Sequence, residues 1–387
     1  MPEISYTRVR RSLVLITAML ICMLSLSSCK LLAELAPTKE DTSKIKDWLV
    51  IPVYYATTRK RAAGAALDYL EQRSEKHSLQ FGVKNVLIPR PALIEISDET
   101  IQRMGWIRIH LDTPLPNGKR PAFPPAENCT IKDCELSNRD MVSQFDKYRA
   151  ASGSKKVIFF AHGCCATFTA SLERSAKIAA SMQVPLVVFD WNSPRGFTKY
   201  LENETTALQS YDAFYAFLNA VEQYVPASDT ILLGHSMGAH FVDNALVRRS
   251  VRNDFKISTP KYSEVIFCEP DIDARAYINH NTKVSALAEK IRIYFNADDG
   301  RLDASATAHG GFERLGRPGV LMPTLNSIPN QYMIDITDCS LGHEIPFFVV
   351  PGFSFERRNS LQELGYESQA QNPNYMIIRR LGSYKTK

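Results

Sequence analysis

The chain has 387 residues, of which 45% are hydrophobic and 22% are charged, and these are ordinary values for a globular protein. Its net charge of +5 is modest, and its lysines and arginines form no stripe with interleaved aromatics, which excludes a nucleic-acid interface of the usual basic kind. The length suits one large α/β domain with insertions.

The N-terminus has the layout of an export signal. Arginines within residues 8–11 precede the apolar segment Leu13–Leu26, which is short for a membrane span, and small residues then lead to Cys29. The sequence Leu26-Ser27-Ser28-Cys29 resembles the bacterial lipobox, in which the cysteine is lipidated and starts the mature protein. We therefore predict a lipoprotein signal peptide over residues 1–28, with an uncleaved membrane anchor as the alternative.

Lipidation at Cys29 also predicts a location for the protein. A polar tether would run over residues 29–47, and Lys30 after the lipidated cysteine is typical of outer-membrane lipoproteins. The predicted location is the bacterial cell envelope, at the outer membrane facing the periplasm, with the lipid anchor as the contact to the membrane. Such a compartment permits disulfides.

From residue 48 onward, strand-like and helix-like segments alternate. Strands are predicted over Leu49–Ala56, Trp106–Asp112, Lys156–Ala161, Pro185–Phe189, Ile231–Leu233, Glu264–Cys268, Ile291–Phe295 and Met333–Ile336, the last of which we expect to end the sheet. Helices are predicted over Ala170–Met182, Thr205–Tyr224 and Ala239–Arg249. Short, unbroken apolar strands separated by helices predict an α/β fold with a mostly parallel, doubly wound sheet covered by helices on both faces.

Two insertions and a C-terminal extension complete the predicted organisation. The α/β domain would span residues 48–350, with insertions at about 114–139 and 302–330, and residues 351–387 would form the extension. The first insertion is proline-rich and is expected to be a loop; either insertion is a candidate lid.

The cysteines outside the signal have different expected uses. Cys129 and Cys134 are close enough in sequence to close a small disulfide loop. Zinc is the competing interpretation for that pair, but no second Cys or His pair has ligand spacing, so no metal is predicted. Cys268 and Cys339 lie in or beside apolar strands and are expected to be buried thiols.

The candidate nucleophile is Ser236. Residues Ile231–Gly238 read as an apolar run that ends in Gly-His-Ser-Met-Gly, and a helical pattern follows at once. A strand that turns directly into a helix forces its middle residue into a strained conformation and leaves little room for neighbouring side chains, hence the glycines. This nucleophile elbow lifts the serine hydroxyl clear of the backbone.

The partners of Ser236 are expected at the carboxyl ends of later strands, because loops of a parallel sheet converge there. In α/β hydrolases the chain order is serine, acid, histidine. His343 follows the predicted last strand, and His309 is its rival. Candidate acids are Asp298 and Asp299 after one strand and Asp271 and Asp273 after another; a helix N-cap or a solvated turn is the commoner fate of such aspartates.

The oxyanion hole is expected to combine two backbone N–H groups. One belongs to Met237, and the other comes from the sequence His162-Gly163-Cys164-Cys165 after a predicted strand, with Cys164 as the preferred donor. Pairing of the adjacent thiols with each other or with a distant cysteine is an alternative use of these residues.

Several motifs together resemble a bacterial family of uncharacterised α/β hydrolases, many of them exported. The motifs are Tyr55–Arg59, Val157–Gly163, Phe189–Gly196, the elbow, Glu269–Asp273, Tyr294–Asp299 and Leu341–His343, in this order, and the resemblance covers roughly residues 48–350. It implies that Asp299 is the acid and His343 the base. The family usually has Tyr-Asn after His-Gly, where this chain has Cys164-Cys165, which leaves the substrate open.

The sequence therefore predicts a membrane-anchored serine hydrolase that cleaves an acyl bond, most readily a carboxylic ester of a small molecule or lipid, through Ser236, His343 and Asp299. No metal or cofactor is needed for this chemistry. The alternatives are an envelope lipoprotein that keeps the scaffold for binding and a redox protein that uses Cys164 and Cys165, although the chain lacks a Cys-x-x-Cys motif at that point.

Overall fold

A computed structural model describes residues 47–63, 68–74, 79–89, 107–110, 134–251, 261–339, 341–345, 366–372 and 374–380. The described residues all belong to one compact unit, residues 47–110 and 123–387. The predicted signal peptide, Cys29, the tether and Cys129 lie outside the described residues. None of the helices in the described ranges has the length and apolarity needed to cross a membrane.

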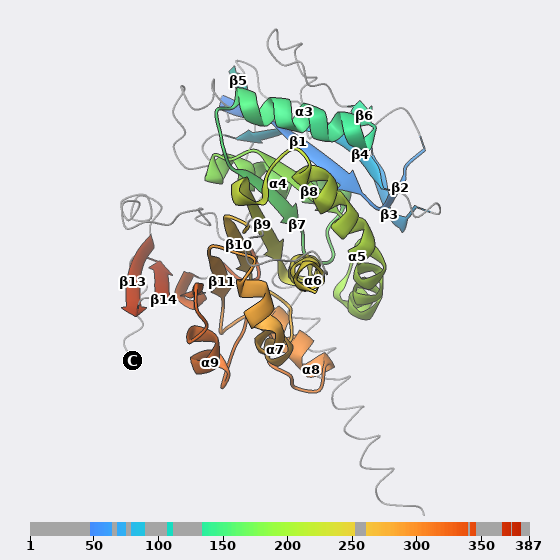
Figure 1. Cartoon of the computed structure of the whole chain (residues 1–387). Coiled ribbons are helices and arrows are strands. Elements are labelled where there is room, and N and C mark those ends of the chain that lie inside the picture. Colours follow the sequence, from blue (N-terminus) through green and yellow to red (C-terminus); the bar gives the residue numbers. More distant parts are fainter. Residues whose placement is uncertain are drawn as a thin grey trace, which may run out of the picture. The chain divides into compact units, whose positions relative to one another are not determined.

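The main feature of the fold is one large, mostly parallel sheet (Figure 1). Its parallel strands are β1 (Asp47–Thr57), β7 (Val157–Ala161), β8 (Leu186–Asp190), β9 (Thr230–His235), β10 (Glu264–Cys268), β11 (Ile291–Phe295), β12 (Gln331–Asp335) and β14 (Tyr375–Arg380). The antiparallel partners are β4 (Gln80–Pro89), β5 (Ile107–His110), β6 (Cys134–Leu136) and β13 (Tyr366–Asn372). The order is β13-β14-β12-β11-β10-β9-β7-β8-β1-β4-β6, with β5 paired to β1.

Helices cover this sheet. They are α3 (Asn138–Ala151), α4 (Phe168–Met182), α5 (Tyr200–Glu222), α6 (Ala239–Ser250), α7 (Ala274–Ser285), α8 (Gly300–Ala308) and α9 (Met322–Asn326). Helix α4 packs on β1, β4 and β8, while α5, α6 and α7 pack in a row, as Figure 1 shows. Every residue of β7 to β11 is buried, as expected for strands with both faces covered. The predicted fold class is confirmed.

Two expectations about the edges of the fold are wrong. The first insertion is not a loop throughout, because β6 pairs antiparallel with β4 and α3 begins at Asn138. The second predicted insertion holds most of α8 and all of α9 and buries Leu315 and Leu325, and its use as a lid stays a prediction. The sheet also does not end at β12, since β14 and β13 extend it.

A buried charge network joins the carboxyl ends of three central strands. Asp190, the last residue of β8, accepts a hydrogen bond from Arg59 Nε at 2.7 Å, and its other oxygen lies 3.2 Å from His162 Nε2. All three side chains are fully buried. Burial alone would raise the pKa of Asp190, but Arg59 and His162 more than offset it and hold that pKa well below its usual range.

We expect Asp190→Asn to lower the free energy of unfolding by about 3–5 kcal/mol, because it leaves the Arg59 guanidinium buried without its counter-charge. Urea unfolding followed by circular dichroism measures the change. Glu71→Ala is the matched control, because it breaks an ion pair with Arg195 that is largely exposed, and surface changes usually stay within about 0.5 kcal/mol. Equal effects of the two substitutions on the free energy of unfolding would contradict a stabilising role of the Arg59–Asp190 pair.

Candidate active site

Ser236 stands at a sharp turn between β9 and α6. Its backbone has φ +52°, the left-handed region that residues other than glycine rarely adopt. The turn is a single 3₁₀ segment, Ser236–Gly238, and α6 continues directly from it. The strand, turn and helix expected around the serine are therefore present.

The two outer glycines of the motif are required by close packing. A Cβ at Gly234 would lie 2.6 Å from Ala239 Cα, and one at Gly238 would lie 2.2 Å from the carbonyl oxygen of Ala161. Real side chains do not approach backbone atoms so closely, so any other residue would push α6 away from β9 or from the end of β7. The glycines thus fix Ser236 against the neighbouring strand.

His343 joins Ser236 to Asp299. Its Nε2 lies 2.8 Å from Ser236 Oγ, and its Nδ1 lies 2.5 Å from Asp299 Oδ2. The other oxygen of Asp299 accepts hydrogen bonds from the amides of Arg301 and Leu302 at the start of α8, so this carboxylate is also the N-cap of that helix. The three side chains that the sequence singled out lie in one hydrogen-bonded line, and all are nearly or fully buried.

The rival acids have other partners. Asp298 is exposed to solvent, and Asp273 caps α7 by accepting from the amide of Ala276. Asp271 accepts hydrogen bonds from Tyr200 and Ser305. Asp271 and Asp273 therefore have structural roles, and Asp298 faces solvent.

The rival histidine also lies elsewhere. His309 follows α8, and its Nε2 lies 2.7 Å from Glu204 Oε1. Its Nδ1 lies 2.7 Å from the Ser305 carbonyl oxygen, so it donates there. Both ring nitrogens are thus engaged away from Ser236.

The loop after β7 lies against the serine. A Cβ at Gly163 would come within 2.9 Å of Ser236 Cβ, so only glycine allows this approach. Arg59 Nη2 donates to the carbonyl of Ala166 at 2.8 Å, and the amide of Cys165 donates to Ser193 Oγ. The Cys165 amide is therefore engaged, and the Cys164 and Met237 amides remain the predicted oxyanion donors.

The two thiols of this loop differ in character. They are free cysteines with their sulfur atoms 3.0 Å apart. The hydrogen bond between them lowers the pKa of Cys165 and raises that of Cys164; burial raises the Cys164 pKa further, and Arg301 favours the Cys165 thiolate. Cys268 and Cys339 are buried, as expected.

The sequence analysis missed one acid of the site. Glu269, the residue after β10, is fully buried, and its Oε2 lies 3.8 Å from His343 Nδ1. Donor atoms of Glu269, Asp299 and His343 lie within 4.8 Å of one another, close enough to hold a metal ion. The short bond to Asp299, however, needs a proton on Nδ1, and a protonated nitrogen is no metal ligand.

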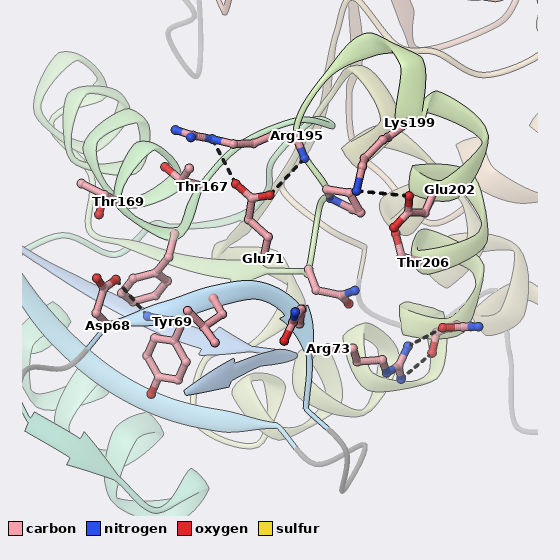
Figure 2. Close-up of a pocket in the computed structure, with 16 residues that line it drawn as sticks. Asp68, Tyr69, Glu71, Arg73, Thr167, Thr169, Arg195, Lys199, Glu202 and Thr206 are labelled. Carbon is pink, nitrogen blue, oxygen red and sulfur yellow. Dashed lines mark hydrogen bonds and ion pairs between the residues drawn. The ribbon is translucent and has the colours of Figure 1, made fainter. Parts of the chain in front are cut away.

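Two cavities border α4. One, of about 1010 Å³, lies between the β2–β3 hairpin (Arg59–Arg61 and Tyr69–Arg73), the start of α4 and the segment 192–209. Figure 2 shows its charged walls, where Arg195 pairs with Glu71 and Lys199 with Glu202. The other, of about 440 Å³, lies between α4 and Leu341, Glu344 and Ile345, beside His343 in the sequence.

The fold and the strand–elbow–helix arrangement are those of an α/β hydrolase. The chain belongs to a family of α/β hydrolases of unknown function (DUF900), whose sequence profile matches residues 137–341. This confirms the resemblance seen in the sequence. Comparison with curated proteins finds no significant match.

Similar solved structures include esterases and lipases at low identity. An esterase/lipase from an uncultured bacterium is 15% identical, with 49% of this chain and 80% of that chain covered and a TM-score of 0.25. A structure titled EstE5-PMSF has the same identity and coverage and a TM-score of 0.24. A lipase-esterase related protein from Clostridium acetobutylicum ATCC 824 is 14% identical, with 47% and 74% covered and a TM-score of 0.23.

We expect iodoacetamide to modify Cys165 before Cys164 at pH 7.5, at a rate at least about tenfold higher, because the thiolate is the reactive form. Peptide mass spectrometry over a time course measures both rates, and buried Cys268 is the internal control. Cys164→Ala should slow the labelling of Cys165, since it removes the hydrogen bond that favours the thiolate. Equal rates for the two thiols, or labelling of neither before reduction, would contradict this assignment.

Proposed function

We propose that the protein is a serine hydrolase that cleaves acyl bonds, most readily carboxylic esters. The single observation that carries the proposal is the line Ser236–His343–Asp299, with 2.8 Å and 2.5 Å between the hydrogen-bonded atoms. A nucleophile, a base in reach of it and an acid that orients the base are what nucleophilic acyl transfer requires.

In this mechanism Ser236 Oγ attacks the acyl carbonyl while its proton moves to His343 Nε2. Asp299 holds the Nδ1 proton, which keeps the imidazole in the tautomer that can accept at Nε2 and stabilises the imidazolium that forms. The amides of Met237 and Cys164 bind the oxyanion, and each such donor contributes about 3 kcal/mol to transition-state stabilisation. His343 then protonates the leaving group, and water hydrolyses the acyl-enzyme by the same route.

A lipid-anchored enzyme at the envelope is the setting that the N-terminal sequence supports. The lipobox-like sequence ending in Cys29 favours a diacylglyceryl anchor, which would bring the site close to lipid acyl chains. Ile178, Met182 and Ile345 give the cavity beside the His343 segment an apolar side, which suits such a chain. Lipid esters are therefore the substrates that we propose to test first.

A catalytically idle binding lipoprotein is the second candidate, since a fold does not fix a function. The strained backbone at Ser236 argues against it. A left-handed conformation in a residue other than glycine costs of the order of 1–3 kcal/mol and is typical of active sites. A scaffold used only for binding would not need this strain.

A fluorophosphonate probe should label the wild-type protein at Ser236, because the activated hydroxyl attacks phosphorus as it attacks a carbonyl. We expect Ser236→Ala to abolish labelling. Ser228→Ala, which changes an exposed serine, is the matched control and should label like wild type. Wild-type labelling no stronger than that of Ser236→Ala would refute the hydrolase proposal.

Hydrolysis of p-nitrophenyl esters of increasing chain length tests the bond and the acyl preference. We expect His343→Ala to lower kcat on the order of 10⁴-fold or more, because it removes the base. If acyl chains enter the cavity beside His343, KM should fall from acetate to longer esters as apolar area is buried. No Ser236-dependent hydrolysis of any ester would exclude carboxylic esters as substrates.

A further inference from the structure

Glu269 is held in place by the main chain around it. It follows β10, the strand next to β9, and its backbone has φ +43°, a left-handed conformation like that of Ser236. A Cβ at Gly316 would lie 2.5 Å from the Glu269 carbonyl carbon, so the segment around Gly316 covers it closely. A glutamate in a strained, fully buried position beside an active site needs an explanation.

The contacts of Glu269 connect it to the loop that carries Gly342 and His343. Its Oε1 accepts a hydrogen bond from Asn296 Nδ2 at 3.3 Å, and the same amide group donates to the carbonyl of Gly342 at 3.0 Å. Its Oε2 has no hydrogen-bond partner and lies 3.8 Å from His343 Nδ1. The free oxygen is thus the one that faces the imidazole.

The charges around Glu269 favour its neutral form at pH 7. Burial, then the nearby Asp299 carboxylate and Glu344 raise its pKa, while Asn296 and Arg301 lower it, and the net pKa is about 9. Asp299 accepts two amide hydrogen bonds in addition to its contact with His343, whereas Glu269 accepts one from a side-chain amide. Two carboxylates this close do not readily both ionise, and the one that accepts more hydrogen bonds keeps the charge.

We propose that Glu269 is a second positioning acid for His343, neutral while Asp299 is ionised and able to accept the Nδ1 hydrogen bond in its place when Asp299 is lost. The proposal rests on the proposed function, because it takes His343 as the general base. Burial is the larger cause that holds the proton on Glu269, and removing the Asp299 charge removes the repulsion that adds to it. The ionised oxygen then has the Nδ1–H group as its nearest donor.

The neutral form of Glu269 also suits the wild-type site. A second negative charge beside His343 would stabilise the imidazolium before the reaction and make it a poorer acid toward the leaving group. With Glu269 protonated, the imidazole faces one carboxylate, as in other triads. The protonated acid is thus compatible with turnover, and it becomes a substitute only if Asp299 changes.

A double-mutant cycle tests the proposal. Asp299→Ser removes the carboxylate but keeps a residue that caps α8 well. We expect Glu269→Gln alone to lower the rate at pH 7 less than Asp299→Ser does, because glutamine has the shape of the neutral acid and keeps the bond from Asn296. Asp299→Ser should be at least about tenfold more active than Asp299→Ser/Glu269→Gln, and the ratio of the two rates should grow with pH as Glu269 ionises.

A measurement of the free energy of unfolding reports the protonation state of Glu269 and does not depend on enzymatic activity. Its folded pKa of about 9 lies above the usual value near 4.5, so the folded chain keeps a proton that the unfolded chain releases as pH rises between these values. Wild type should therefore lose stability relative to Glu269→Gln from pH 5 to pH 9. Glu202→Gln, an exposed control, should show no such trend.

The outcomes are distinguishable. If wild type shows no Ser236-dependent labelling or hydrolysis, the proposed function fails, while the stability comparison still reports the state of Glu269. If hydrolysis is present but Asp299→Ser and the double variant have equal rates at every pH, Glu269 does not act through His343. If Glu269→Gln at pH 7 is as impaired as Asp299→Ser, Glu269 is ionised in the resting site and the proposal is overturned.

Discussion

The close approach of α6 to the end of β7 is the constraint on which the site depends. Position 238 lacks room for a Cβ because the Ala161 carbonyl oxygen would lie 2.2 Å from it, and a Cβ at position 163 would lie 2.9 Å from Ser236 Cβ. These close contacts hold the candidate nucleophile and the loop after β7 together. The left-handed conformation of Ser236 persists because β9 and α6 determine it from both sides. Main-chain packing therefore sets the positions of nucleophile and loop before His343 or Asp299 contributes.

Two buried carboxylates near this edge of the sheet show how contacts decide charge. Asp190 and Glu269 are both fully buried, and burial favours the neutral form of each. Asp190 has Arg59 and His162 as partners, and they keep it ionised as a brace below the loop after β7. Glu269 instead has the Asp299 carboxylate as neighbour, which acts in the same direction as burial. The same carboxyl group is therefore an anion at Asp190 and a neutral acid at Glu269.

The central part of this fold was predictable from the sequence, and the edges were not. Strands such as Glu264–Cys268 and Ile291–Phe295 are short apolar runs, and their bounds are those of β10 and β11. The edge strands β6 and β13 have polar patterns, and only pairing with β4 and β14 makes them strands. The glycine elbow and the rule of strand ends led to Ser236, to His343 and to the pair Asp298 and Asp299, and the family resemblance selected Asp299 from that pair. Glu269 was missed because an acid after a strand usually lies in a solvated turn, and its burial depends on the distant segment around Gly316.

The cysteine pair after Gly163 changes the side chains of the oxyanion loop more than its backbone. Cys165 has φ +64°, a conformation that asparagine, the residue that the sequence resemblance implies at this point, adopts more readily than cysteine does. The chain keeps it through the hydrogen bond from the Cys165 amide to Ser193, which donates in turn to Asn203 Oδ1 at 2.7 Å. Because backbone amides are what an oxyanion hole uses, the reaction needs no particular side chain here. In the proposed hydrolase the two thiols would therefore bear on which substrate fits, and the proposed acyl-transfer chemistry would not depend on them.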